Sequence, residues 1–321
     1  MRAVVHSTAG GPEVLAVRDV ALPELGPHQI RVRVRATALN RADLLQRRGL
    51  YPAPPGWPAD IPGLEYAGEV EFAGSAVSRW RAGDRVMGLV GGGAHAEQVV
   101  VHEDEALAIP ARLTFEEAAA VPEAFLTAFD ALVTRGRLAR GERVLIHAAG
   151  SGVGTAAIQL ARRLGATVLG TSRSAAKLER ARSLGLDIGI DTSQGPFPDR
   201  VGEPVQLVLD VLGAPALADN LAVLAPQGRL ILLGFLQGSK ADLDLEPVLR
   251  KRLQVTGTVM RTRSLAERIE LAETIRKDLL PWLESGEVVP VVDRVLPMAE
   301  IAEGHRLLAQ GENFGKIVLV W

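Results

Sequence analysis

Cysteine is absent from the 321-residue sequence. Its absence excludes disulfide bonds, thiolate catalysis and every zinc or iron–sulfur site that depends on cysteine ligands. A strong charge of one sign is also missing, because the formal net charge is −2, and this leaves no electrostatic footprint for nucleic acid or an anionic membrane surface. We therefore expect neither nucleic acid nor a membrane as a partner, and small neutral substrates fit better.

Long hydrophobic runs are missing as well. No stretch of about 18 consecutive apolar residues exists, and residues 1–13 contain no apolar signal-peptide core. Hydrophobic residues nevertheless make up 47% of the chain, which can fill two cores in a chain of this length. The composition predicts a soluble, globular, cytoplasmic protein with room for two domains.

A strand, a glycine-rich turn and a helix follow one another between Arg143 and Ala166. The apolar run 144–146 suits a strand covered on both faces, and apolar side chains then recur at helical spacing until Gly165 ends the helix. Such a turn lets the backbone approach a pyrophosphate, whose charge lies against unpaired N–H groups at the positive end of the helix. The residues expected to contact a dinucleotide are Gly150, Ser151, Gly152, Val153 and Gly154.

The spacing of this turn departs from the strict G-x-G-x-x-G pattern, because Ala149 and Ser151 hold its first two glycine positions. A tight structural turn is the alternative interpretation. The flanking apolar strand and amphipathic helix favour dinucleotide binding.

The order of the other predicted elements divides the chain into two domains of different type. In the amino-terminal part, short strand-like runs between glycine and aspartate turns predict a compact, mostly antiparallel β domain. Beyond the glycine turn, strands alternate with helices, which predicts a parallel, doubly wound sheet. The tail returns to β character with one helix, so we expect it to rejoin the amino-terminal domain. The expected strands are 2–6, 14–20, 29–38, 66–74, 83–90, 95–101, 166–172, 186–190, 205–213, 228–234 and 253–260, and the expected helices are 40–48, one opened by Thr114 and broken at Pro122, 175–185, 215–225 and 265–283.

Several segments resemble the medium-chain dehydrogenase/reductase superfamily, in its zinc-free quinone oxidoreductase branch that includes zeta-crystallin. The resemblance covers the whole chain, and within the branch it is strongest to the quinone oxidoreductases induced by a tumour suppressor. It implies an α/β protein with a GroES-like, mostly antiparallel catalytic domain at 1–122 and 262–321 and a Rossmann domain at 123–261. It also implies NADPH in the cleft between them. The segments that carry it are NRADLLQRRGLYPAPPG, IPGLEYAGEV, AAAVPEAFLTAFDAL, VLIHAAGSGVGTAAIQLARRLGA and NFGKIVL.

Zinc-dependent alcohol dehydrogenases of this superfamily hold catalytic zinc with a cysteine, a histidine and a second cysteine. The matching positions here hold Asn40, Leu64 and Glu123, so the resemblance implies a protein without a metal site. Leucine offers no lone pair to a metal, and without zinc no alkoxide is stabilised by a Lewis acid. We expect reduction of an electrophilic acceptor, with Asn40 and Glu123 either as site residues or as an ordinary hydrogen-bonded pair.

The end of the strand at 166–172 predicts the choice of cofactor. NAD enzymes usually carry an acidic residue there, about 20 residues beyond the turn, which binds the ribose hydroxyls. This chain has Ser172 and Arg173 instead, with Lys177 one turn into the next helix. A hydroxyl and positive charge would attract a 2′-phosphate, which favours NADPH. The alternative is a capped helix start with solvated basic residues.

Four further residues are assigned by the resemblance. Thr127 matches the superfamily threonine that packs on the nicotinamide, and Asn313 and Lys316 resemble the cleft segment near the carboxyl terminus. Tyr51 matches the cleft tyrosine, whose phenol could donate a hydrogen bond to an acceptor carbonyl. A packing tyrosine and a solvated lysine are the alternatives. His147, in the strand before the turn, is interpreted as a satisfied core histidine.

Together these observations predict a zinc-independent NADPH:quinone oxidoreductase with Tyr51, Asn40 and Glu123 at the reacting centre. An enone or enoyl reductase is the first alternative, because an activated alkene would suit the same site. A crystallin-like NADPH-binding protein with little turnover is the second. The strand near 253–260 could pair across a two-fold axis, and the branch is commonly dimeric, so we expect a homodimer.

Overall fold

The computed structural model describes all residues from 1 to 321, and the chain divides into two compact units. Unit 1 consists of Met1–Glu123 and Met260–Trp321, and unit 2 of Ala124–Val259. The assignment of one part of the chain as the catalytic domain and of the other as the cofactor-binding domain remains a prediction.

Unit 1 is built on a seven-stranded, mostly antiparallel sheet in the order β14-β15-β3-β4-β5-β7, with β6 against β3. The tail belongs to this unit, because β15 pairs antiparallel with β3; only β14 and β15 run parallel. A separate ribbon is formed by β1 and β2. The strands are β1 (Arg2–His6), β2 (Leu15–Asp19), β3 (Gln29–Ala38), β4 (Glu65–Ala73), β5 (Arg85–Leu89), β6 (Gln98–His102), β7 (Leu107–Ala108), β14 (Val292–Pro297) and β15 (Lys316–Val320).

Strand β3 shows why the sheet has one buried face. Its apolar residues Ile30, Val32 and Val34 are buried in a core with strands β4, β5 and β6, while Arg33 and Arg35 point to solvent. A period of two places alternate side chains on opposite faces of a strand. The half-buried strand predicted at 29–38 is confirmed at those residues.

The helices of unit 1 lie between and after these strands. The expected capping box is confirmed, because the Thr114 hydroxyl accepts from the Glu117 N–H and Glu117 accepts from the Thr114 N–H. These helices are α1 (Arg41–Arg47), α2 (Phe115–Ala119), α8 (Leu265–Asp278), α9 (Leu280–Ser285) and α10 (Ile301–Gln310); α3 (Pro122–Phe129) starts here and continues into unit 2.

The prediction of one helix over 265–283 is wrong. The chain forms α8 and α9, with a break at Leu279. Pro281 explains the break, because proline has no N–H to donate and its ring collides with the carbonyl four residues earlier, whereas proline is well tolerated in the first turn of a new helix. Gly286, at φ +78°, ends α9 as expected.

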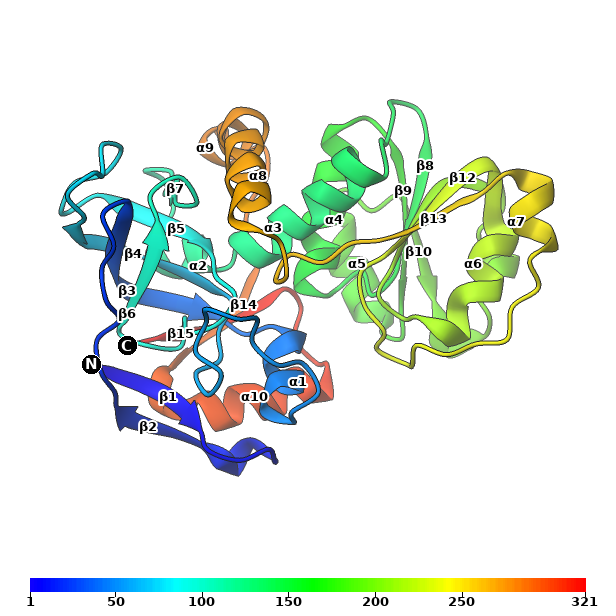
Figure 1. Ribbon diagram of the computed structural model, residues 1–321. Helices are drawn as coiled ribbons and strands as arrows, with labels where there is room; N and C mark the ends of the chain where they lie inside the picture. The colour runs from blue at the N-terminus through cyan, green and yellow to red at the C-terminus, as the bar shows by residue number, and fades with distance from the viewer. The chain divides into compact units, whose positions relative to one another are not determined.

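Unit 2 is a six-stranded parallel sheet in the order β10-β9-β8-β11-β12-β13, which confirms the doubly wound fold. Figure 1 shows α4 and α5 on one face of this sheet and α6 on the other. The strands are β8 (Arg143–Ile146), β9 (Thr167–Ser172), β10 (Ile188–Asp191), β11 (Val205–Asp210), β12 (Leu224–Leu232) and β13 (Gln254–Gly257), and the helices are α4 (Gly152–Arg163), α5 (Ala175–Arg182), α6 (Leu217–Val223) and α7 (Glu246–Lys251).

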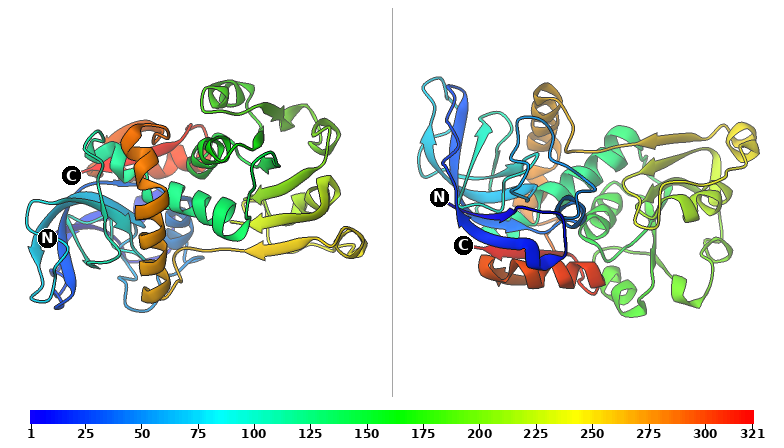
Figure 2. Two further views of the ribbon diagram at one scale, coloured as in Figure 1. Left: turned by 90° about the horizontal axis from the view of Figure 1, so that it is seen from above. Right: turned by 60° about the horizontal axis from the view of Figure 1, so that its bottom comes forward.

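The two chain ends lie close together in unit 1, where the carboxyl-terminal strand β15 and helix α10 lie beside the amino-terminal segments (Figure 2). The order β15-β3-β4 therefore places segments from both ends of the sequence at one sheet. No helix has both the length and the apolar content that a membrane crossing requires.

Candidate functional site

Three polar residues from distant parts of the sequence meet at one end of the unit 1 sheet. Strand β3 is antiparallel to both β15 and β4, so the end of β3 lies beside the first residues of its two neighbours. Lys316 begins β15, Glu65 begins β4, and Asn40 follows β3 as the N-cap of α1. The fold thus brings together residues that the sequence keeps far apart.

The centre of this cluster is a buried ion pair. The ammonium nitrogen of Lys316 lies 2.8 Å from Oε1 of Glu65, and it donates to Oδ1 of Asn40 (2.5 Å) and to the Leu39 carbonyl (3.0 Å). Glu65 is fully buried and Lys316 is 4% exposed. The prediction that Lys316 contacts a cofactor is not tested, but the ammonium is not solvated, because it is buried and three protein oxygens lie within 3.0 Å of it.

Asn40 closes the network. Its side-chain nitrogen donates to Oε1 of Glu65 (2.7 Å) and to the Ala38 carbonyl (3.3 Å), while its oxygen accepts from Lys316. Its backbone N–H donates to Asp43, in a capping box at the start of α1. Since both amide hydrogens are already donated within the chain, the geometry favours a positioning role for Asn40.

Glu123 lies against the same ion pair. Its backbone N–H donates to Oε2 of Glu65 (2.8 Å), while its own carboxyl makes no hydrogen bond or ion pair. Burial, and next the negative charge of Glu65, raise the pKa of the Glu123 carboxyl to about 8. A carboxyl with such a pKa is largely protonated at neutral pH, which is the condition for a proton donor.

Arg261 holds the segment around Tyr51. It is 5% exposed, and its guanidinium donates to the Tyr51 carbonyl (2.8 Å), the Gly91 carbonyl (2.7 Å) and Oε1 of Gln46 (2.5 Å). Its carbon Cζ also lies 4.9 Å from the centre of the Tyr51 ring, within cation–π range. Burial, and then the charge of Glu123, raise the pKa of the Tyr51 phenol. Tyr51 therefore keeps its proton and can donate it in a hydrogen bond.

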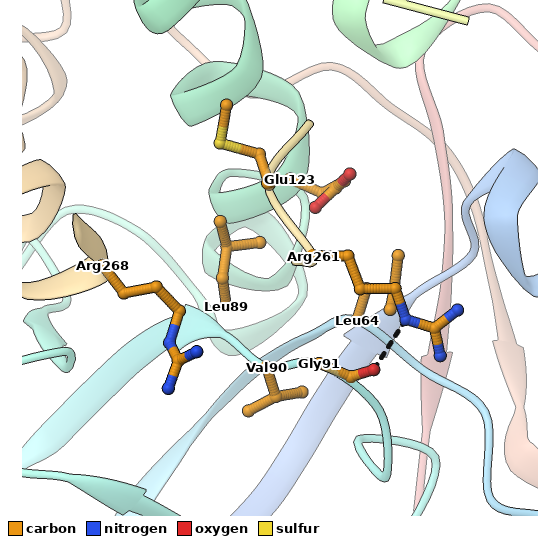
Figure 3. A pocket seen from close by; sticks show the side chains of 8 residues that line it. Leu64, Leu89, Val90, Gly91, Glu123, Arg261 and Arg268 are labelled. Atoms are coloured by element: carbon orange, nitrogen blue, oxygen red, sulfur yellow. Dashed lines mark hydrogen bonds between the residues drawn. The ribbon is translucent and has the colours of Figure 1, made fainter. Parts of the chain in front are cut away.

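A small pocket lies within unit 1 beside these residues (Figure 3). Its walls are mostly apolar, and Glu123 supplies the one carboxyl group. Figure 3 shows the guanidinium of Arg261 turned toward Gly91, apart from the Glu123 carboxyl. The lining residues are Leu64, Leu89, Val90, Gly91, Glu123, Met260, Arg261 and Arg268. Leu64 and Glu123, which the sequence analysis matched to zinc-ligand positions, thus lie at one pocket.

Arg261 and Glu65 were missed by the sequence analysis. An arginine after a strand-like segment gives no local sign of burial, and neither residue belongs to a spacing motif. Glu65 is the last residue of Gly63-Leu64-Glu65, which matches the sequence G-H-E of the zinc enzymes. The sequence analysis used this match for Leu64 but assigned no role to Glu65.

The glycine turn of unit 2 packs tightly against the start of α4. Ser151 caps α4, its hydroxyl accepting from the Gly154 N–H at 3.0 Å. A Cβ on Gly154 would lie only 2.4 Å from the Ala148 carbonyl oxygen, so only glycine allows this contact between turn and helix. The hydroxyl of Thr127 is buried without a hydrogen-bond partner. These features fit a nicotinamide dinucleotide, although the contacts of the named residues stay predictions.

Strand β9 ends at Ser172, as predicted. The Ser172 hydroxyl accepts from the Ser174 N–H at 3.1 Å, and Ser174 caps α5, its hydroxyl accepting from the Lys177 N–H at 3.4 Å. Arg173 is exposed. The structure thus contains the capped helix start that the alternative interpretation requires, and contact with a 2′-phosphate stays a prediction.

Two other residues singled out in the sequence, His147 and Asn313, are buried and hydrogen-bonded within the protein. His147 is a satisfied core histidine, as predicted, because its ring nitrogens lie 2.8 Å from the Thr171 hydroxyl and 2.7 Å from the Asn220 side-chain oxygen. The Asn313 side chain is buried and donates to the Gly315 carbonyl at 2.7 Å, and its contact with a cofactor stays a prediction. No group of three or more histidine, aspartate or glutamate side chains is arranged to hold a metal ion.

Comparisons with known proteins agree with this architecture. The family model of the alcohol dehydrogenase GroES-like domain matches residues 26–111, and that of the zinc-binding dehydrogenases matches residues 152–277. A quinone oxidoreductase of Pseudomonas aeruginosa is 37% identical, over 97% of this chain and 97% of its own.

Two solved structures superimpose on the whole chain. The quinone oxidoreductase of Escherichia coli, complexed with NADPH, has a TM-score of 0.89 at 28% identity, and a protein described as an NAD-dependent alcohol dehydrogenase has a TM-score of 0.89 at 35% identity. Each match covers 100% of both chains. The resemblance found in the sequence is confirmed, and this chain belongs to the medium-chain dehydrogenase/reductase superfamily, in its quinone oxidoreductase branch.

Proposed function

We propose that this protein reduces quinones and similar conjugated carbonyl acceptors with NADPH, and that it does so without zinc. The observation that carries the proposal is the chemistry at the positions that match zinc ligands in the resemblance. There, Asn40 is hydrogen-bonded to a buried ammonium group, and Leu64 has no lone pair to offer. The reacting centre is therefore suited to an acceptor that is already electron-poor.

Zinc does not fit this set of residues. A zinc ion at Asn40 would lie beside the positive charge of Lys316, and the two would repel each other in a buried environment. Glu123 is the one side chain of the three that could act as a zinc ligand, whereas catalytic zinc sites use three protein ligands. We derive no step through a metal.

NADPH fits the turn of unit 2, and the chain is an NADPH-dependent oxidoreductase. We propose that residues 150–154 bind the pyrophosphate, that Ser172, Arg173 and Lys177 bind the 2′-phosphate, that Thr127 packs on the nicotinamide, and that Asn313 and Lys316 also contact the cofactor. When bound, NADPH supplies the reducing electrons. The residues of the protein bind and orient the reactants and exclude water.

The acceptor contacts come from unit 1 in this proposal. The Tyr51 phenol donates a hydrogen bond to the acceptor carbonyl. Arg261 holds the tyrosine in place, because its guanidinium donates to the Tyr51 backbone carbonyl and lies over the Tyr51 ring. A donor placed in advance stabilises the charge that develops on the oxygen during reduction. Asn40 and the ion pair of Lys316 and Glu65 hold the surrounding backbone.

Metal analysis tests this proposal. The purified protein should contain no stoichiometric zinc, and quinone reduction with NADPH should survive prolonged treatment with a chelator. One tightly bound zinc per chain, with activity lost on chelation, would overturn the zinc-independent reading. Strong binding of NADPH without turnover of any quinone or enone would instead favour a crystallin-like role.

We also propose a homodimer formed through β13. This strand is the last in the unit 2 sheet and pairs only with β12. Val255 in this edge strand is 43% exposed, so the edge presents an apolar side chain to solvent. Such an edge is a template for pairing with a second copy. Light scattering of the parent and of a Val255→Lys variant would test it, because a lysine at the edge should give monomers.

A further inference from the structure

The Glu123 carboxyl is the one acidic group in a pocket with mainly apolar walls (Figure 3). We propose that Glu123 is the residue that donates the proton to the oxygen of the acceptor when a quinone is reduced. This inference rests on the proposed function and assigns it a catalytic acid. Three features of the structure support it: the carboxyl has no partner, its cationic neighbours are engaged elsewhere, and acidic neighbours disfavour its ionisation.

Each cation near Glu123 is engaged elsewhere. Lys316 is ion-paired with Glu65 and donates to Asn40 and the Leu39 carbonyl, and the three guanidinium nitrogens of Arg261 each donate to another oxygen. Arg268, which also lines the pocket, is ion-paired with Glu105 and donates to the Arg263 carbonyl. No side chain therefore neutralises an ionised Glu123 by direct contact.

The acidic neighbours are Glu65 and Asp43, both fully buried. Glu65 accepts from the Glu123 backbone N–H, which keeps its charge close to the Glu123 side chain. The charges of Lys316 and Arg261 and the amino-terminal end of α3 favour ionisation. Burial and the two acidic neighbours prevail, so the pKa of Glu123 rises to about 8.

Reduction of a quinone to a hydroquinone takes up two electrons and two protons. When bound, NADPH would supply both electrons and one proton as a hydride, so that a C–H bond of the dihydronicotinamide would break and an O–H bond would form on one quinone oxygen. The O–H bond of the Glu123 carboxyl breaks and its proton forms the O–H bond on the other quinone oxygen, which the Tyr51 hydroxyl polarises. The resulting carboxylate is repelled by Glu65 and takes up a proton from solvent before the next turnover.

The protonation state can be measured without cofactor or substrate. Infrared difference spectra of the glutamate-labelled protein against Glu123→Gln should show the carbonyl stretch of a protonated carboxyl at pH 7, and this band should disappear as the pH is raised past about 8. Glu284→Gln, which changes an exposed glutamate of unit 1, is the matched control and should leave the band in place. A Glu123 carboxyl that is already ionised at pH 6 would overturn the inference.

Kinetics test the donation itself. Glu123→Gln should lower kcat/KM for an unsubstituted benzoquinone by about 100-fold, the usual size of general acid catalysis, and should remove the loss of parent activity above pH 8. Tetrahalogenated quinones give weakly basic products that need no acid, so with them the variant should keep most of its rate. The affinity for NADPH, measured by fluorescence, should not change.

The outcomes separate the two proposals. Equal rates of parent and Glu123→Gln with both classes of quinone would refute proton donation and leave the quinone reductase function intact. A parent protein that reduces no quinone would refute the proposed function, and donation to a quinone with it, whatever the infrared titration shows. If the variant does not fold, the pH profile of the parent still decides, because a rate that stays constant from pH 6 to 10 with benzoquinone contradicts the inference.

Discussion

Removal of the buried ammonium group by Lys316→Met tests whether the ion pair organises unit 1. The change leaves Glu65 fully buried with only Asn40 and the Glu123 N–H as donors. Breaking a buried pair by removing one partner typically costs about 3 to 5 kcal/mol, because an uncompensated charge stays in the interior. We expect a loss within that range at pH 7.

Urea unfolding followed by tryptophan fluorescence measures this loss of stability in unit 1, which contains the ion pair. All four tryptophans, at positions 57, 80, 282 and 321, belong to unit 1. Lys277→Met is the matched control, because this exposed lysine of α8 makes no ion pair, and its loss should stay within about 0.5 kcal/mol.

A second substitution tests the same ion pair. The double variant Lys316→Met/Glu65→Gln should recover most of the stability. A loss below about 1 kcal/mol, or a double variant that stays as unstable as Lys316→Met, would refute the account of the cluster.

Three further predictions concern single residues. Lys177→Ala should remove most of a preference for NADPH over NADH that we expect to be at least tenfold, or about 1.4 kcal/mol, in titrations of binding; unchanged affinities would place the 2′-phosphate elsewhere. Tyr51→Phe should lower quinone turnover by about tenfold to a hundredfold with nearly unchanged NADPH affinity, whereas a packing tyrosine predicts almost no kinetic effect. Glu123→Gln should stabilise the protein progressively from pH 5 to 8, by at most about 4 kcal/mol in urea unfolding. The reason is that the unfolded carboxyl ionises near its ordinary pKa while the folded one keeps its proton up to about pH 8; a gain that shrinks over this pH range would contradict that pKa.

The Rossmann-type unit could be predicted from the sequence because its signals are local. A strand, a turn and a helix each have a period or a residue preference that is visible within about 20 residues. The failure at α8 and α9 was also local, since Pro281 stood in the sequence as a signal for a break. Helix α7 was not predicted, because residues 246–251 form a short, largely exposed helix without a buried face.

The polar cluster could not be predicted in the same way. Lys316 and Glu65 meet only because β15 and β4 flank β3, and no local pattern encodes strand order. A lysine at the start of a strand is usually solvated, so the sequence alone does not predict that Lys316 is buried. Arg261 was missed because its burial also depends on the fold and not on a local pattern. The resemblance supplied Tyr51, Asn40 and Glu123 as site residues, while their different roles follow from contacts that only the fold creates.

Steady-state rates on one panel of substrates test the central claim most directly. The claim is that a centre without zinc, with a neutral acid at Glu123, reduces acceptors that are already electron-poor. With NADPH, ortho- and para-quinones should be turned over, saturated ketones and aldehydes should not, and alcohols with NADP or NAD should give no reduction of the cofactor. Alkenal turnover far above quinone turnover would favour the enone reductase instead, and oxidation of alcohols at a rate comparable to quinone reduction would contradict the account.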